Sequence, residues 1–381
     1  MFRIESAGKT SSDRNEGVEL FRCVSMFLIL VLHILGQGGV IGYSGGHREQ
    51  FCTAWFLETL GYCSVDCYAV ISGFVNKERE FKFSRFVLRW LEVVFWLVVP
   101  LAVAKLFFTD NSIEWSLSET FLPLTSKTFW YFNAYALLFP FIPLLNIGLE
   151  KIGKRNHLAI LTFLFVTTFT LHIFNGGDDF VLGGGYCGMW LIILYVFGAY
   201  FRLYGIPKWA KWYVTIPVFL FSSAFAWSME MHKVDLCNAK IIEKSGSVWS
   251  ILDRFVNYTS PFIVIMALCL LLFFAQVRIK PKVLRKTVVL LGKCSFGVYL
   301  IHVGPIIWDK FMYLRYKEYA SFSPCKLVFS VIGTAVILFI LFDLLSITRY
   351  MIFKYCGINH FIDKTFYGKN LRNNEIADKG E

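Results

Sequence analysis

Apolar residues are gathered into ten runs that are separated by short polar segments. The runs are 18–37, 54–75, 86–108, 129–148, 157–174, 187–203, 212–229, 259–277, 287–309 and 326–348. A helix needs about 20 predominantly apolar residues to cross the hydrocarbon core of a bilayer, and each run approaches or exceeds that length. The pattern predicts an all-α fold, a polytopic integral membrane helical bundle with about ten transmembrane helices.

The Lys and Arg residues between the runs predict the orientation. With the N-terminus placed inside, the inner segments and tails contain 26 of these residues and the outer segments contain 10. Because positive residues concentrate on the cytoplasmic side, both termini are expected to be cytoplasmic. The predicted organisation is an N-terminal tail (1–14), a membrane-embedded domain (15–350) and a C-terminal tail (351–381). The first run lacks a small-residue cleavage site, so we expect a retained helix rather than a signal peptide.

Composition narrows the class of protein. The 381 residues are 56% hydrophobic, 18% aromatic and 17% charged, whereas charged residues make up about 25% of soluble proteins. The net charge of +11 is spread in short clusters between apolar runs, so membrane lipids are expected partners and nucleic acid is not. The ten cysteines show no zinc-binding spacing, and neither a metal nor a cofactor is predicted. A disulfide among Cys52, Cys237 and Cys325 stays open.

The first run contains three polar side chains that a helix surrounded by lipid would avoid, Glu19, Arg22 and His33. A charge at bilayer depth costs about 2.5–3.5 kcal/mol on insertion scales, which makes such residues functional candidates. Eleven residues separate Arg22 from His33, or three turns plus roughly 20°, so both lie on one stripe. Glu19 falls on the same stripe and can pair with Arg22. The structural alternative is that His33 is a hydrogen-bonded packing residue and that Glu19 and Arg22 anchor the helix at the lipid headgroups. The stripe that the three residues share favours a functional role.

The second and third runs contain further candidates. Asp66 falls near mid-membrane, where a carboxylate needs a partner or a proton, and we favour a functional or network role. Ser72 and Gly73 are small enough for close helix approach, and Gly73 is interpreted as a packing residue. Arg85 and Arg89 lie on one face at the inner end of the third run. They either follow the bias of positive charge to the inside or clamp a phosphate.

Two later runs add aromatic and polar candidates. Trp130 lies in an aromatic stretch at the start of the fourth run, which fits an interfacial belt or a platform for a sugar ring. Ser295, Tyr299 and His302 form a polar stripe in the ninth run. His33 and His302 fall at similar depths, which suggests a shared polar cavity, although depth alone does not make two helices neighbours.

Together these residues resemble the acyltransferase-3 family of integral-membrane acyltransferases over about 15–350. The most specific element is the Arg-x10-His spacing of Arg22 and His33. The other matching elements are Val65-Asp66…Ile71-Ser72-Gly73-Phe74, the Arg85/Arg89 pair, Trp130-Tyr131-Phe132…Pro140…Pro143-Leu144-Leu145-Asn146, and Phe296-Gly297-Val298-Tyr299-Leu300-Ile301-His302. The pattern is similar to the branch associated with bacterial surface polysaccharides. Two positions depart from it: Glu19, where relatives often have Asp, and Val303, where relatives often have a polar residue.

The resemblance implies an O-acetyltransferase, which moves an acyl group, usually acetyl, from cytoplasmic acyl-CoA to an extracytoplasmic carbohydrate or lipid-linked glycan. The implied location is a bacterial inner membrane. Carried over by position, His33 is the catalytic histidine with Arg22 as its motif partner, and Arg85 and Arg89 contact the donor phosphates.

Two questions stay open at this stage. The first question is the role of His33: its neutral imidazole can remove the acceptor proton as a base, or it can carry the acyl group. Among the residues around it, Glu19 is expected to hold Arg22. The expected acceptor or cavity-lining residues are Asp66, Ser72, Trp130, Tyr299 and His302. The alternative function is a transporter or flippase for an acyl group or a lipid-linked sugar. The oligomeric state is not indicated.

Overall fold

The computed structural model describes residues 14–107, 120–125, 128–175, 180–244 and 247–366, so nearly all of the predicted N-terminal tail and the last part of the predicted C-terminal tail, 367–381, lie outside the described residues. No strand occurs within these ranges, which confirms the predicted all-α class. The helices are α1 (Glu16–Leu35), α2 (Val40–Tyr43), α3 (Arg48–Tyr62), α4 (Ser64–Val75), α5 (Phe83–Phe107), α7 (Trp130–Leu164), α8 (His172–Asn175), α9 (Gly188–Tyr204), α10 (Trp212–Asn238), α11 (Ser247–Asp253), α12 (Pro261–Phe274), α13 (Lys282–Val303), α14 (Pro305–Ile307) and α15 (Pro324–Tyr355).

Seven helical stretches of the described chain are long and apolar enough to cross a membrane, which confirms a polytopic helical bundle. They are Glu16–Tyr43, Phe83–Leu106, Trp130–Leu171, Trp212–Asn238, Ser250–Phe274, Lys282–Val303 and Pro324–Tyr355. The remaining predicted runs are helical but differ in form. Run 54–75 is divided at Cys63 between α3 and α4, and run 187–203 forms the shorter α9. Run 157–174 begins in the last part of α7 and continues through the π-helix Phe165–Leu171 into α8. The count of ten crossings stays a prediction.

Helix α7 is interrupted at Gly153, whose φ of +75° and ψ of 164° are not helical. A residue with a side chain rarely adopts this positive φ, so glycine is the residue suited to the break. The interruption falls between the predicted runs 129–148 and 157–174. The two arms of α7 therefore correspond to two separate runs of the sequence.

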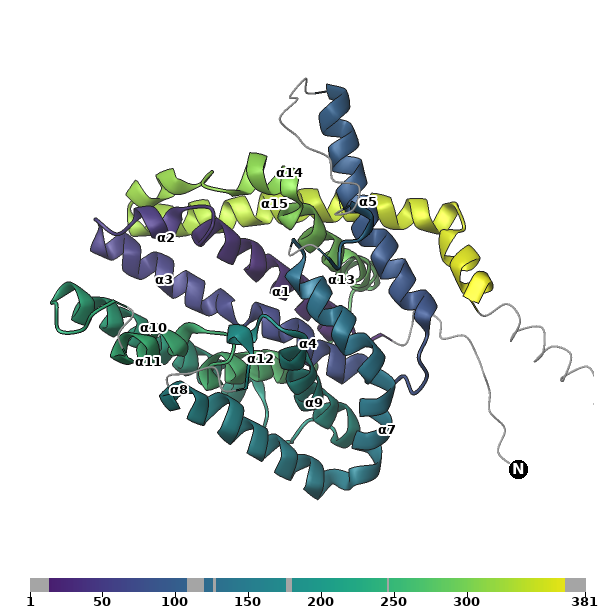
Figure 1. Cartoon of the computed structure of the whole chain (residues 1–381), viewed down its shortest axis with the longest axis horizontal. Helices are drawn as coiled ribbons and strands as arrows, with labels where there is room; N and C mark the ends of the chain where they lie inside the picture. The colour runs from purple at the N-terminus through teal and green to yellow at the C-terminus, as the bar shows by residue number, and fades with distance from the viewer. Residues whose placement is uncertain (1–13, 108–119, 126–127, 176–179, 245–246, 367–381) are drawn as a thin grey trace, which may run out of the picture.

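Helix α1 is the central element of the bundle. Its first turn is capped by Asn15, whose side chain accepts hydrogen bonds from the amides of Gly17 and Val18. It contacts α3, α4, α12, α13 and α15, and Figure 1 shows it between α13 and α15 on one side and α3 and α4 on the other. Large apolar side chains such as Phe21 and Leu30 are fully buried along it. Because α1 is enclosed on several sides, its polar residues are placed inside the protein.

Reciprocal glycines join α4 to α9. A Cβ added at Gly73 would lie 2.0 Å from the carbonyl oxygen of Tyr195, and one added at Gly198 would lie 2.0 Å from that of Val70. Small residues let membrane helices approach this closely. The interpretation of Gly73 as a packing residue is therefore confirmed, and this contact fixes the position of α4 beside the cavity described below.

Ion pairs form between residues that were predicted to lie on the same side of the membrane. Arg48 and Asp235, both expected near the outer face, form two hydrogen bonds at 2.5 and 2.9 Å. Arg349 and Glu92, both expected near the inner face, also pair. This arrangement agrees with the predicted alternation of the chain. All ten cysteines, including the three in predicted outer loops, are free.

Candidate active site

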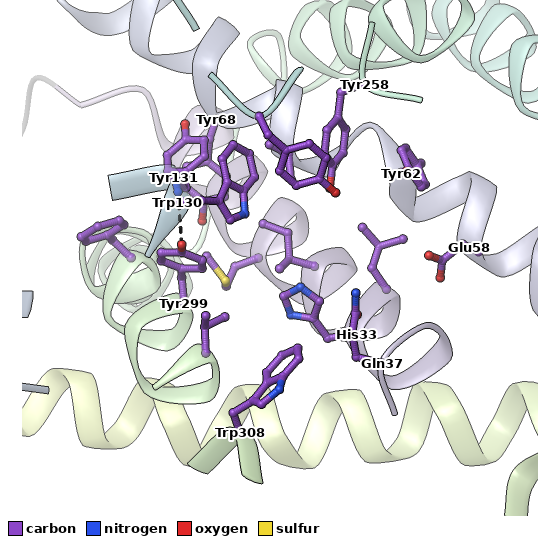
Figure 2. A pocket seen from close by; sticks show the side chains of 17 residues that line it. His33, Gln37, Glu58, Tyr62, Tyr68, Trp130, Tyr131, Tyr258, Tyr299 and Trp308 are labelled. Carbon is purple, nitrogen blue, oxygen red and sulfur yellow. Dashed lines mark hydrogen bonds between the residues drawn. The ribbon is translucent and has the colours of Figure 1, made fainter. Parts of the chain in front are cut away.

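A cavity of about 280 Å³ lies against the C-terminal half of α1. Met26, Ile29 and His33 face it at intervals of three and four residues, which is the stripe that the sequence predicted for this helix. The described part of its lining is rich in hydroxyl and aromatic groups, with six tyrosines and two tryptophans. Figure 2 shows His33 and Gln37 between Tyr299 on one side and Glu58 on the other. The cavity is therefore a largely apolar, aromatic compartment that contains a few polar groups, among them His33, Gln37 and Glu58.

The two histidines that the sequence placed at similar depths are in direct contact. His33 Nδ1 lies 2.8 Å from His302 Nε2, so α1 and α13 bring the two rings together. His302 Nδ1 lies 2.6 Å from the carbonyl oxygen of Val298. A carbonyl only accepts, so His302 Nδ1 must be protonated, and in the neutral ring Nε2 is then an acceptor. His33 Nδ1 consequently donates, which leaves the lone pair of His33 Nε2 free to take a proton or attack a carbonyl.

A second ring holds His33 from another direction. Trp308 packs edge-to-face on His33 with a centroid distance of 5.3 Å. The segment after Trp308 is joined to the end of α1 by backbone hydrogen bonds from Leu314 to Gln37 and from Tyr316 to Gly38. Contact with His302 and Trp308 restricts the orientation of the imidazole. Fixed orientation of a reacting group is a large component of catalysis.

Arg22 and Glu19 form the predicted pair one turn below the cavity. Arg22 Nη1 lies 2.7 Å from Glu19 Oε1, and Glu19 is buried. Arg22 is not among the residues that line the cavity, which ends at Met26 on this helix. Its connection to the cavity is through Tyr68, whose hydroxyl lies 2.9 Å from the Arg22 carbonyl oxygen and 3.0 Å from Ser295 Oγ. Arg22 and His33 therefore share a helix face but occupy different levels.

Arg85 and Arg89 each pair with a carboxylate near the predicted inner face. Arg85 pairs with Glu78, and Arg89 Nη1 lies 2.6 Å from Glu92 Oε2. The Arg89 guanidinium also lies 5.6 Å from the centroid of Phe296, a residue that lines the cavity. Neither arginine lines the cavity itself, so both lie outside it, with Phe296 between Arg89 and the space beside His33.

The remaining predicted site residues divide into two groups. Trp130 and Tyr299 line the cavity, and the Tyr299 hydroxyl accepts a hydrogen bond from the amide of Tyr131 at 3.4 Å. Asp66 and Ser72 do not line it. Asp66 is fully buried and accepts a hydrogen bond from Trp190 Nε1 at 2.9 Å, while Ser72 Oγ donates to the Tyr68 carbonyl. The structure thus places Asp66 in the contact between α4 and α9.

Several cavity residues were missed by the sequence reasoning. Glu58 is a carboxylate inside run 54–75, so the rule that selected Asp66 applied equally to it. Tyr186 and Tyr258 lie in connections between runs, where nothing in the pattern distinguishes them from other loop aromatics. Desolvation raises the pKa of the hydroxyl of Tyr186, a residue that is half exposed.

Comparison with known proteins gives one match. The family model Acyl_transf_3, described as an acyltransferase domain, matches residues 15–355, which is nearly the whole chain and includes every residue of the cavity. Searches against curated proteins and against solved structures give no match.

Proposed function

We propose, from the premise that this chain belongs to the Acyl_transf_3 family of acyltransferases, that it transfers an acetyl group from cytoplasmic acyl-CoA to a hydroxyl of an extracytoplasmic carbohydrate. Membership of the family and the apolar helices make the chain a membrane acyltransferase. The donor, the acceptor, the role of His33 and a bacterial inner-membrane location belong to the proposal.

The observation that supports the proposal best is the contact between His33, which lines the cavity, and His302, which lies behind it and does not line the cavity itself. A sugar hydroxyl is a weak nucleophile until its proton is removed, and neutral imidazole can remove it near pH 7. The hydrogen bonds to His302 and Val298 leave His33 Nε2 unprotonated in the neutral pair. His33 therefore has the protonation state that a base or a nucleophile requires.

Two routes use this nitrogen. In direct transfer, His33 Nε2 takes the hydroxyl proton while the oxygen attacks the thioester carbonyl. The C–S bond then breaks, and the protonated His33 gives that proton to the departing CoA thiolate. In a relay, His33 Nε2 attacks the thioester carbonyl, the C–S bond breaks and CoA leaves as the thiolate. The acceptor hydroxyl then attacks the acyl-imidazole, the N–C bond breaks, and the hydroxyl proton passes to the freed Nε2 and from there to the thiolate or to water. In both routes the arginines at the predicted inner face suit the phosphates of the donor, because guanidinium groups form strong contacts with phosphate.

The test uses labelled acetyl-CoA, purified protein in lipid nanodiscs and a panel of glycans. We expect label on a glycan with the wild type and a loss of about 10²- to 10⁴-fold in His33→Ala, the usual contribution of a general base. His47→Ala is the matched control, since His47 is exposed at the start of α3. Transfer by His33→Ala at the wild-type rate would contradict the role of His33. Movement of label across the membrane without covalent transfer would instead indicate a transporter.

The relay is distinguished from direct transfer by omitting the acceptor. Label retained on the wild-type protein and absent from His33→Ala supports the acyl-imidazole. Label that leaves the donor only when a glycan is present supports direct transfer.

A further inference from the structure

Among the described residues that line the cavity, Glu58 is the one carboxylate. It comes from α3, and its Oε2 is buried without a hydrogen-bond donor in the described part of the chain. A carboxylate withdrawn from water is costly unless hydrogen-bonded or paired. Asp66, the comparable group on α4, has Trp190 as a donor. Glu58 therefore has hydrogen-bonding capacity that the described protein leaves unused and that is available to a ligand.

Aromatic rings form a continuous wall beside Glu58. The ring centroids of Tyr62 and Tyr258 are 4.9 Å apart, those of Tyr258 and Tyr186 are 5.1 Å apart, and those of Tyr186 and Trp130 are 4.6 Å apart. All four residues line the cavity. The C–H face of a sugar ring packs on aromatic rings while its hydroxyls remain at the edge. The wall and the carboxylate thus offer the two kinds of contact that a pyranose requires.

The charge of the lining discriminates between kinds of sugar. No Lys or Arg is among the described residues that line the cavity. Hydroxyls of a neutral sugar that donate to Glu58 favour its ionised form, which burial alone disfavours. An acidic sugar would instead bring a negative group of its own into this space with no cation to balance it, and like charges in a site of low dielectric repel strongly. At about 280 Å³ the cavity is also at the small end of ligand sites, which suits a single ring.

We propose that Glu58 binds the acceptor: its carboxylate accepts hydrogen bonds from hydroxyls of one neutral sugar ring packed on the Tyr62–Tyr258–Tyr186–Trp130 wall, and excludes acidic sugars. This inference rests on the proposed acyl transfer to a carbohydrate. With one end of the ring held at Glu58, a hydroxyl at the other end lies toward His33, since Figure 2 shows the two residues facing the same cavity.

The test compares methyl glucoside with methyl glucuronide, which differ by one carboxylate. Binding to the full chain in nanodiscs is measured by saturation-transfer NMR, which suits weak ligands. We expect the wild type to bind the glucoside at least about tenfold more tightly than the glucuronide. Glu58→Gln, which keeps the shape and removes the charge, is expected to weaken glucoside binding about tenfold, the size of one hydrogen bond to a charged group, and to reduce the discrimination below about threefold.

Glu49→Gln is the control, because Glu49 is exposed on the first turn of the same helix. Equal binding of the two sugars by the wild type, unchanged discrimination in Glu58→Gln, or no binding of either sugar would overturn the inference. Acyl transfer is measured separately on the same samples. If Glu58→Gln transfers acetyl groups to a glycan at the wild-type rate, this inference is contradicted and the proposed function is not. If the sugars bind with the expected discrimination but no acceptor is acylated, the proposed function is contradicted.

Discussion

Replacement of His302 tests whether it positions His33. His302→Phe keeps an aromatic ring against Phe342 and removes the acceptor nitrogen 2.8 Å from His33 Nδ1. His302→Gln places an amide oxygen where Nε2 was and can still accept from His33. The pair therefore separates loss of the hydrogen bond from loss of packing.

The expected magnitude follows from the buried donor that His302→Phe leaves behind. A buried donor without an acceptor costs about 1–3 kcal/mol. The His33 ring can relieve this cost by turning out of its reactive orientation, and restoring that orientation then lowers the rate by about 5- to 150-fold. We therefore expect kcat for acyl transfer to fall about 10- to 100-fold in His302→Phe and to stay within a few-fold of wild type in His302→Gln. The KM for acyl-CoA should not change, because His302 lies away from the arginines.

The assay is steady-state transfer of labelled acetyl groups by protein in nanodiscs, with the amount of monodisperse protein measured for each variant. Full activity in His302→Phe would refute the positioning role. Equal loss in both variants at normal protein levels would show that the ring is needed for packing rather than for its acceptor nitrogen.

Two further predictions concern the elements that hold the site. Gly73→Val places a Cβ 2.0 Å from the Tyr195 carbonyl oxygen and should lower the thermal unfolding temperature by more than about 5 °C. Gly148→Ala is the control and should leave that temperature unchanged, because its Cβ meets nothing within 4 Å. Equal unfolding temperatures of the two variants would contradict the close approach of α4 and α9. Glu92→Gln removes the charge that pairs with both Arg349 and Arg89, and it should destabilise the protein by about 3–5 kcal/mol, measured by unfolding in detergent. An unchanged stability would contradict a structural role for the buried Glu92–Arg349 pair.

The sequence predicted much of α1 correctly because a helix has a fixed period. The 100° step placed Arg22 and His33 on one stripe, and His33 does face the cavity along it together with Met26 and Ile29, whereas Arg22 lies one turn below the cavity. Depth in the membrane could also be counted from the run boundaries, which put His33 and His302 at one level. The class of fold followed from the apolar runs alone.

Contacts between helices could not be predicted, since periodicity describes each helix separately. The approach of α1 to α13 depends on Gly292, where a Cβ would lie 2.6 Å from Glu19 Oε2, and this is visible only when the partner is known. The same limit explains the contrast between Asp66 and Glu58. Both are carboxylates in run 54–75, but Asp66 accepts a hydrogen bond from Trp190 on α9, whereas Glu58 lines the cavity. What lies opposite a polar group decides whether it is structural or available to a ligand.

Under the proposed function, the separation of the arginines from His33 limits how the acyl-CoA donor reaches the histidine. Arg22 and His33 are about 16 Å apart along α1 at 1.5 Å per residue. Of the residues discussed, two contact both the cavity and an arginine below it. Tyr68 lines the cavity, and its hydroxyl is hydrogen-bonded to the Arg22 carbonyl oxygen. Phe296 lines the cavity, and its ring lies under the Arg89 guanidinium. If the donor phosphates bind at the arginines, the thioester must extend past Tyr68 and Phe296 to meet His33. Substrate entry would therefore depend on the side-chain conformation of these two rings, since the backbone of α1 and α13 is fixed by close packing.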